Sequence, residues 1–145
     1  MIRRMQFIDL PQILEIEKEC FKVPWPQIAF LNILTREDNY SIVYEIEKII
    51  GYGISLILSD SIYIANLAVK EKFRKQGIGS MLLSNMLRYG YKIGRKIAKL
   101  EVRVSNIPAI SLYKKFGFRK TGVIKCYYPD GEDALIMKRD FLVYK

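Results

Sequence analysis

The stretch SIYIANLAVKEKFRKQGIGSMLLSNMLRYGYKI, residues 61–93, decides the fold of this chain. Its first nine residues are rich in β-branched and aromatic side chains, which predicts a strand over residues 61–69. From Ile78 to Ile93 the period changes, because polar residues recur every four positions, and this predicts an amphipathic helix. The apolar residues expected on the buried side of this helix are Ile78, Met81, Leu82, Met86 and Leu87.

The turn between this strand and this helix, Arg74-Lys75-Gln76-Gly77-Ile78-Gly79, suits a bound anion. Glycines let the backbone come close to a ligand, and the unpaired amides and dipole of a helix N-terminus favour phosphate. A pyrophosphate is the natural guest, although a tight turn needs such glycines even without a ligand. Leu82 stands where the dinucleotide fingerprint has its third glycine, and no Gly-Lys-Ser/Thr follows, so neither NAD nor ATP is favoured.

Outward from this unit, local patterns predict the remaining elements. Before it we expect a strand at 2–7, a helix from an N-cap at Asp9 to near Phe21, a helix at 27–34, and a hairpin of strands 41–46 and 49–58. After it we expect a strand at 99–104, a helix capped by Ser105 or Asn106 and ended by Gly117, and an antiparallel pair at 119–127 and 134–141. Only one parallel crossover occurs in this order. The chain is therefore expected to form one α/β or α+β domain over residues 1–145, with a single mixed sheet covered by helices.

Composition narrows the function classes. The 145 residues suit one domain, and no window approaches the roughly 18 apolar residues of a membrane helix, so a cytoplasmic protein is expected. Cys20 and Cys126 stand apart without metal-site spacing, which favours reduced thiols and no bound metal. Histidine is absent, which excludes Ser-His-Asp and Cys-His catalysis. Any acid or base must be a carboxylate, Tyr, Lys or Cys.

Charge is distributed unevenly along the chain. Residues 70–120 contain 14 Lys and Arg against two acidic residues, whereas residues 1–69 contain 6 basic and 9 acidic residues. The middle of the chain therefore favours an anionic partner. Nucleic acid, a phosphorylated cofactor and a solvated basic face all remain open at this point.

Four stretches of the sequence resemble one enzyme family. The pattern R-x-x-G-x-G after the strand IYIANLAV resembles the acetyl-CoA signature of the GCN5-related N-acetyltransferases (GNAT), and LEVRVSNIPAISLYKKFGF, residues 100–118, is similar to the family's second signature. YYPDGEDALIMKR, residues 127–139, and the early Pro24-Trp25 resemble the RimI-like N-terminal acetyltransferases. The resemblance implies the GNAT fold, an α/β (α+β) domain whose mixed, mostly antiparallel sheet has about seven strands flanked by about four helices.

The resemblance also implies a set of residues that bind acetyl-CoA. Backbone groups of Leu67, Ala68 and Val69 would pair with the pantetheine arm, while the side chains of these residues would be core. The pyrophosphate would lie on the amides of the loop and the first helical turn. These residues are Arg74, Lys75, Gln76, Gly77, Ile78, Gly79 and Ser80. Asn106 would hydrogen-bond the cofactor near the thioester, a role that is compatible with capping a helix.

Glu101 would be the general base and Tyr113 the general acid by this resemblance. From the residues alone, Glu101 shares a strand face with Lys99 and Arg103, so an ion-pair ladder is the alternative. The helical spacing of Tyr113 also suits a core aromatic.

The expected reaction is direct transfer of the acetyl group to the N-terminal α-amine of a protein, with ribosomal proteins as candidates. Deprotonating an α-amine at pH 7 costs about 1.4 kcal/mol, against about 4.6 kcal/mol for a lysine, so a carboxylate base suits the α-amine better. The residues expected to bind the acceptor peptide are Phe21, Val23, Trp25, Tyr40, Tyr127, Tyr128 and Glu132. Glu132 and Asp133 would favour a peptide with basic residues after its first position.

Two other functions remain as alternatives. One is acetylation of lysine side chains or of a small amine, and the other is a non-catalytic module that binds CoA or RNA. With acetyl-CoA and an acceptor N-terminus as partners, the chain is expected to contact neither membrane nor nucleic acid directly. It is expected to be a monomer or a weak homodimer.

Overall fold

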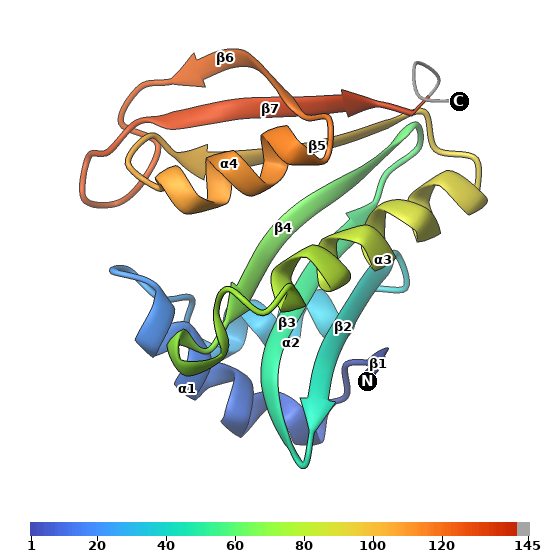
Figure 1. The fold of residues 1–145 in the computed structure, drawn as a ribbon, viewed down its shortest axis with the longest axis vertical. Helices are drawn as coiled ribbons and strands as arrows, with labels where there is room; N and C mark the ends of the chain where they lie inside the picture. The colour runs from blue at the N-terminus through green and yellow to red at the C-terminus, as the bar shows by residue number, and fades with distance from the viewer. Residues whose placement is uncertain (142–145) are drawn as a thin grey trace.

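The computed structural model describes residues 1–141, which form one seven-stranded sheet with four α-helices (Figure 1). The strands are β1 (Ile2–Arg4), β2 (Asn39–Ile46), β3 (Lys48–Ile57), β4 (Ser61–Val69), β5 (Ile97–Arg103), β6 (Arg119–Ile124) and β7 (Ala134–Asp140). The helices are α1 (Leu10–Cys20), α2 (Gln27–Leu34), α3 (Ile78–Lys92) and α4 (Ile107–Lys115), and two short 3-10 helices are η1 (Phe7–Asp9) and η2 (Glu71–Phe73). The predicted α/β class and the mixed sheet are confirmed.

The sheet has the order β1-β2-β3-β4-β5-β7-β6, and all neighbouring pairs are antiparallel except β4 and β5. These two parallel strands pair only where Ser61–Tyr63 lie beside Ile97–Lys99. Beyond that point they diverge, which is visible in Figure 1 as a split between the two halves of the sheet. The split opens at the carboxyl ends of both strands.

Two hydrophobic clusters lie on opposite faces of the sheet. Residues of α3 and α4, such as Leu82, Met86 and Ile110, pack with Ile62 and Ile64 of β4 on one face. Residues of α1 and α2, such as Ile13 and Phe30, pack with Tyr52, Ile54 and Ala68 on the other. Each helix covers the sheet with one apolar stripe, so the two layers of helices enclose the sheet (Figure 1).

A β-bulge interrupts β4 at Ala65. Ile54 of β3 pairs with Asn66 while the next residue, Ser55, pairs with Ile64, so Ala65 is the extra residue. A bulge of this kind re-aims the side chains that follow it. Ile62 and Ile64 therefore face α3, whereas Ala68 faces α1 and α2.

Some expectations about the elements were wrong. The first strand ends at Arg4 and gives way to η1. Asp9 is the N-cap residue of α1, as predicted, but its side chain does not cap this helix and accepts hydrogen bonds from Arg3 and from the backbone N–H of Gln6. Met81 is 42% exposed, because it falls outside the stripe of α3 that Leu82 and Met86 place against the sheet.

Within residues 1–141, no helix combines the length and the apolar character needed to cross a membrane.

Candidate functional site

Two adjoining cavities lie where β4 and β5 diverge. The loop cavity, of about 600 Å³, lies between the α1–α2 loop and the β6–β7 loop. The glycine-loop cavity, of about 560 Å³, lies between the end of β4, the start of α3 and α4. The residues that line both are Phe21, Leu67, Asn106, Ala109 and Tyr113. A molecule in one cavity can therefore touch a molecule in the other.

Backbone amides and positive charge line the glycine-loop cavity. Gly77 is the N-cap of α3 with a φ of 80°, a left-handed conformation that glycine adopts without strain. This turn starts the helix at the cavity, and the amides of a first helical turn lack partners within the helix. Arg74 lies beside them and donates to Val69 O at 3.1 Å and to Cys20 Sγ at 3.2 Å. The arrangement fits an anion at the N-terminus of α3.

Glycine at position 79 leaves space between α3 and α4. A Cβ on Gly79 would lie 3.6 Å from Leu112 and 3.8 Å from Val69, so any side chain there would narrow the cavity. The predicted cofactor residues Leu67, Ala68, Val69, Arg74, Lys75, Gly77, Ile78, Gly79, Ser80 and Asn106 all line this cavity. Gln76 is exposed and is not among the residues that line it.

Glu101 enters the loop cavity from β5 and is held by tyrosines. Its Oε1 accepts a hydrogen bond from Tyr63 of β4 and another from Tyr127 at 3.2 Å. Burial raises the pKa of Tyr63, and so does its hydrogen bond to Glu101, which keeps the phenol protonated as the donor. Among residues 1–141 no ion pair joins Glu101 to Lys99 or Arg103, so the ion-pair ladder does not form.

Tyr113 and Asn106 stand at the junction of the two cavities on α4. Tyr113 is 8% exposed, packs edge-on against Phe118, and has its pKa raised by burial and, to a smaller extent, by Tyr128. Its hydroxyl therefore stays protonated well beyond neutral pH. Asn106 caps α4 by accepting from the Ala109 N–H at 3.3 Å, as its position before Pro108 predicted.

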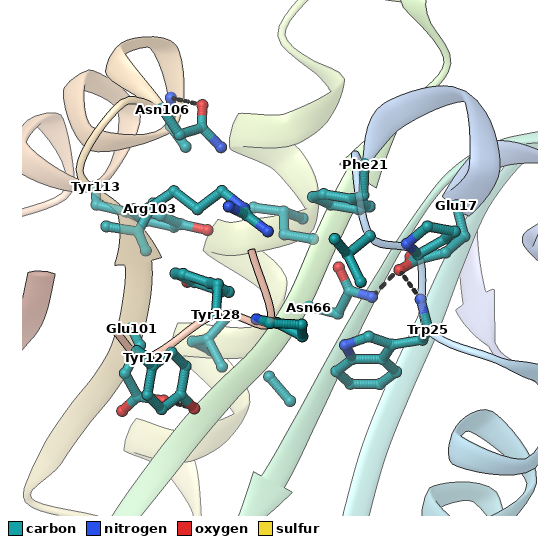
Figure 2. A pocket seen from close by; sticks show the side chains of 18 of the residues that line it. Glu17, Phe21, Trp25, Asn66, Glu101, Arg103, Asn106, Tyr113, Tyr127 and Tyr128 are labelled. Carbon is teal, nitrogen blue, oxygen red and sulfur yellow. Dashed lines mark hydrogen bonds between the residues drawn. The ribbon is translucent and has the colours of Figure 1, made fainter. Parts of the chain in front are cut away.

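Two loops form the outer walls of the loop cavity. Phe21, Val23 and Trp25 come from the α1–α2 loop, and Tyr127 and Tyr128 come from the β6–β7 loop. Figure 2 shows Trp25 on one side of the cavity and Tyr127 and Tyr128 on the other. An ion pair of 3.7 Å between Lys22 and Asp130 links the loops.

The sequence comparison decides the family. Residues 10–118 match the model of the Acetyltransferase (GNAT) family. The chain belongs to the GNAT family. It is an acetyltransferase, as its signature motifs predicted.

Similar GNAT proteins extend along almost the whole chain. The N-alpha-acetyltransferase of Sulfolobus acidocaldarius is 36% identical over 150 residues, which cover 94% of this chain and 89% of that protein. The [ribosomal protein bS18]-alanine N-acetyltransferase of Escherichia coli K12 is 34% identical over 140 residues, covering 94% of each. The crystal structure of the ribosomal-protein-S18-alanine N-acetyltransferase from Escherichia coli has a TM-score of 0.89 at 31% identity, covering 97% of this chain and 92% of that one.

Two residues expected at the acceptor site of this GNAT chain lie elsewhere. Tyr40 stacks on Tyr89 of α3 with ring centroids 3.8 Å apart and donates to Asn85, because β3 and β4 lie between β2 and the split. Glu132 does not line the loop cavity and accepts a hydrogen bond from Arg103 at 2.7 Å.

The acidic charge expected to select basic peptides is already neutralised. Arg103 binds both Asp130 and Glu132, and Lys125 lies 3.2 Å from Asp133. The hydrogen bond from Arg103 holds the pKa of Asp130 below its usual value, so this carboxylate stays ionised and paired. This pairing removes the main reason to expect a preference for basic peptides.

Sequence reasoning missed three polar residues of the loop cavity and its edge. Tyr63 holds Glu101, and Glu17 and Asn66 line the cavity from α1 and β4. Tyr63 and Asn66 lie in a mostly apolar strand and Glu17 lies in an amphipathic helix, and these patterns indicate only which face is buried. Their roles depend on which strands are neighbours, which local periodicity does not contain.

Proposed function

We propose that this GNAT protein transfers an acetyl group from acetyl-CoA to the N-terminal α-amine of another protein. The proposal rests on one observation, the junction of the two cavities. A cavity suited to a phosphorylated cofactor meets a cavity that contains a carboxylate, and Tyr113 lines both. This is the arrangement that direct transfer between two bound molecules needs.

Acetyl-CoA fits the glycine-loop cavity by shape and charge. The amides of Gly77 to Ser80 and the side chains of Arg74 and Lys75 suit its pyrophosphate. Leu67 to Val69 border the split without a partner strand on the side of β5, because β4 and β5 pair only as far as Tyr63. Their backbone groups suit the amides of the pantetheine arm, and Asn106 lies at the thioester end. Bound there, acetyl-CoA supplies an acyl thioester.

Glu101 is the general base in this proposal. The neutral amine attacks the thioester carbon, a C–N bond forms, the C–S bond breaks, and the proton of the amine passes to Glu101 directly or through water. Before the attack, the ammonium form must lose a proton to give that neutral amine, which costs about 1.4 kcal/mol for an α-amine at pH 7 and about 4.6 kcal/mol for a lysine. The carboxylate suits the smaller task, and the donors Tyr63 and Tyr127 orient it toward the cavity.

Tyr113 is the general acid. Its raised pKa keeps the hydroxyl protonated, so that it can donate to the sulfur as the thiolate departs. Burial among α4 and β7 side chains keeps it in one position between the two cavities.

The acceptor is a peptide end that enters between the two loops. Phe21, Val23, Trp25, Tyr127 and Tyr128 line this entry and present mostly apolar surface. The similarity to a bS18-alanine N-acetyltransferase supports a ribosomal protein N-terminus as the first acceptor to test.

Turnover of acetyl-CoA with short peptides tests the proposal. Peptides with a free N-terminus should be acetylated, and the same peptides with a blocked N-terminus and an internal lysine should not. Glu101→Gln and Tyr113→Phe should each lower kcat about 100-fold, the usual size of an acid–base contribution. Tyr91→Phe, on the exposed side of α3, is the matched control and should keep full activity.

Two outcomes would contradict the proposal. Activity on blocked, lysine-containing peptides alone would assign the enzyme to side-chain acetylation. Full activity in Glu101→Gln would remove the base from the mechanism.

A further inference from the structure

A buried carboxylate lies behind the loop cavity. Glu17 of α1 is 1% exposed and accepts three hydrogen bonds: from the Tyr52 hydroxyl, from Asn66 Nδ2 at 2.9 Å, and from the Trp25 backbone N–H at 2.8 Å. No Lys or Arg pairs with it among residues 1–141. Burying a carboxylate is costly unless its hydrogen bonds are made. These three bonds therefore join α1, the sheet and the wall of the loop cavity.

Glu17 determines which way the amide of Asn66 points. Oε1 of Glu17 accepts both from the Tyr52 hydroxyl and from Asn66 Nδ2, so the amide nitrogen of Asn66 faces it. The carbonyl oxygen of Asn66 then faces the other way. Figure 2 shows this oxygen turned from Glu17 toward the cavity. No protein donor within residues 1–141 satisfies it.

The bulge at Ala65 brings Asn66 to the side of the sheet that holds the base. Ile62 and Ile64 face α3, so Tyr63 faces the opposite side together with Glu101. After the bulge, Asn66 also lies on that side, two positions along the β3–β4 ladder from Tyr63. Two positions span about 7 Å along a strand, so Asn66 follows Tyr63, the donor to Glu101, on the same side of the sheet.

The loop cavity has a closed end and an open end. Asn66 is 9% exposed and Glu17 is 1% exposed, and the rings of Phe21 and Trp25 lie beside them, so this end is closed to solvent. Val23, Tyr127 and Pro129 are exposed, so the other end opens to solvent. A peptide whose amine lies at Glu101 must leave through the open end, and its first side chain then occupies the closed end.

We propose that Asn66 Oδ1 accepts a hydrogen bond from the hydroxyl of the acceptor's first residue, so that serine and threonine ends are preferred. Glu17 is the positioning residue that keeps this carbonyl turned into the cavity. The inference rests on the proposed α-amine acetylation and names the first residue of its acceptor. Alanine fits the same space, but it offers no hydroxyl to the carbonyl oxygen of Asn66, so its complex lacks this hydrogen bond and should react more slowly.

The test compares peptides that differ only in the first residue. For the wild-type protein, kcat/KM should be about fivefold to tenfold higher for serine than for alanine, the value of one neutral hydrogen bond. Threonine should exceed its isostere valine by a similar factor. In Asn66→Leu, which keeps the size and removes the acceptor, both ratios should fall to about one.

Glu17→Gln tests the positioning role. Glutamine keeps the shape, but its NH2 group must face either the Trp25 N–H or the donors from Asn66 and Tyr52, so the amide of Asn66 loses its fixed orientation. The serine-to-alanine ratio should fall at least twofold while the KM for acetyl-CoA stays unchanged. Asp9→Asn is the matched control, because Asp9 is also buried but binds Arg3 far from the cavity. It should lower stability and leave the ratio as it is.

The outcomes separate this inference from the proposed function. Equal rates for serine and alanine peptides with the wild-type protein would overturn the hydroxyl contact, and this measurement needs no variant to fold. An equal loss for every peptide in Asn66→Leu would show that Asn66 binds the main chain or the amine, which also overturns it. No turnover with any free-amine peptide would refute α-amine acetylation itself.

Discussion

At the residue scale, the protonated phenols around Glu101 and Tyr113 are the most consequential feature. Burial raises the pKa of Tyr63 and of Tyr113, and it raises the pKa of Tyr128 to about 12. None of these hydroxyls ionises in the range where an α-amine, with a pKa near 8, loses its proton. The acceptor amine, and not the enzyme, should therefore control the rate between neutral and mildly alkaline pH.

This reasoning predicts the pH profile of kcat/KM. The value should rise with pH until about pH 8, where the α-amine becomes neutral, and should then stay level to about pH 10, because Tyr113 remains protonated. Initial rates with a saturating concentration of acetyl-CoA measure it. A decline between pH 8 and pH 10 would mean that an acid with a lower pKa than Tyr113 is required.

Tyr63→Phe should impair the reaction without impairing binding. The substitution removes a donor to Glu101 and leaves the ring in place, so the carboxylate loses part of its orientation. A charge-assisted hydrogen bond of about 1.5 kcal/mol corresponds to a kcat about tenfold lower, with both KM values within twofold. Steady-state kinetics check this prediction. A raised KM for the peptide at unchanged kcat would instead place Tyr63 in acceptor binding.

At the scale of elements, α3 sits unusually close to β4. A Cβ on Gly90 would lie 2.7 Å from Cγ2 of Ile62, so the helix approaches the strand only because residue 90 is glycine. Since α3 begins at the glycine-loop cavity, this contact also sets where its first turn lies. The close packing at Gly90 therefore helps to position the candidate anion site at the other end of the helix.

Gly90→Ala should destabilise the protein despite the better helix propensity of alanine. The propensity gain is about 1 kcal/mol, whereas an added buried methyl group with no space costs about 1–3 kcal/mol. The free energy of unfolding in urea should therefore fall by about 1 kcal/mol. Ser84→Ala, on a partly exposed position of α3, is the control and should change stability by less than about 0.5 kcal/mol. A stabilised Gly90→Ala protein would show that the helix moves without cost.

At the scale of the whole molecule, one acidic residue fastens the N-terminal segment to the sheet. Asp9 is 3% exposed and binds the Arg3 guanidinium at 2.8 and 2.9 Å, while Arg3 also binds Glu45 of β2. Burial raises the pKa of Asp9, but the hydrogen bonds from Arg3 and from the Gln6 N–H lower it more, so the net pKa lies below its ordinary value. Such a group stabilises the fold above the ordinary pKa and loses this effect as pH falls through the lower, folded-state pKa.

Asp9→Asn should therefore cost stability in a pH-dependent way. At pH 7 the free energy of unfolding should fall by about 2 kcal/mol, because Arg3 loses the ionic partner that is buried. Below about pH 4 the difference between wild type and variant should shrink, since Asp9 becomes protonated in the wild type. Urea titrations at several pH values measure both. A difference that stays constant down to pH 3 would contradict the role of the ionised carboxylate.

The sequence by itself determined most of the elements and the glycine loop of this protein. Residues 61–93 show a strand, a glycine turn and an amphipathic helix in their own spacing, and the structure has β4 and α3 at those places. Helix and strand patterns are local, because residues that share a face are three or four positions apart in a helix and two positions apart in a strand. The expected interior of α3 was wrong at Met81, because this residue falls outside the stripe that packs against the sheet.

The tertiary structure alone decided which side chains meet. Tyr63 reaches Glu101 because β4 pairs briefly with β5, Asn66 turns toward Glu17 because Ala65 is a bulge, and Tyr40 turns to Tyr89 because β2 lies under α3. These contacts join residues 38 to 49 positions apart along the chain and depend on strand order and register. A period of two or of 3.6 residues shows which side chains share a face, but it does not depend on what that face packs against. It therefore predicts that a side chain is buried but not which residue it contacts.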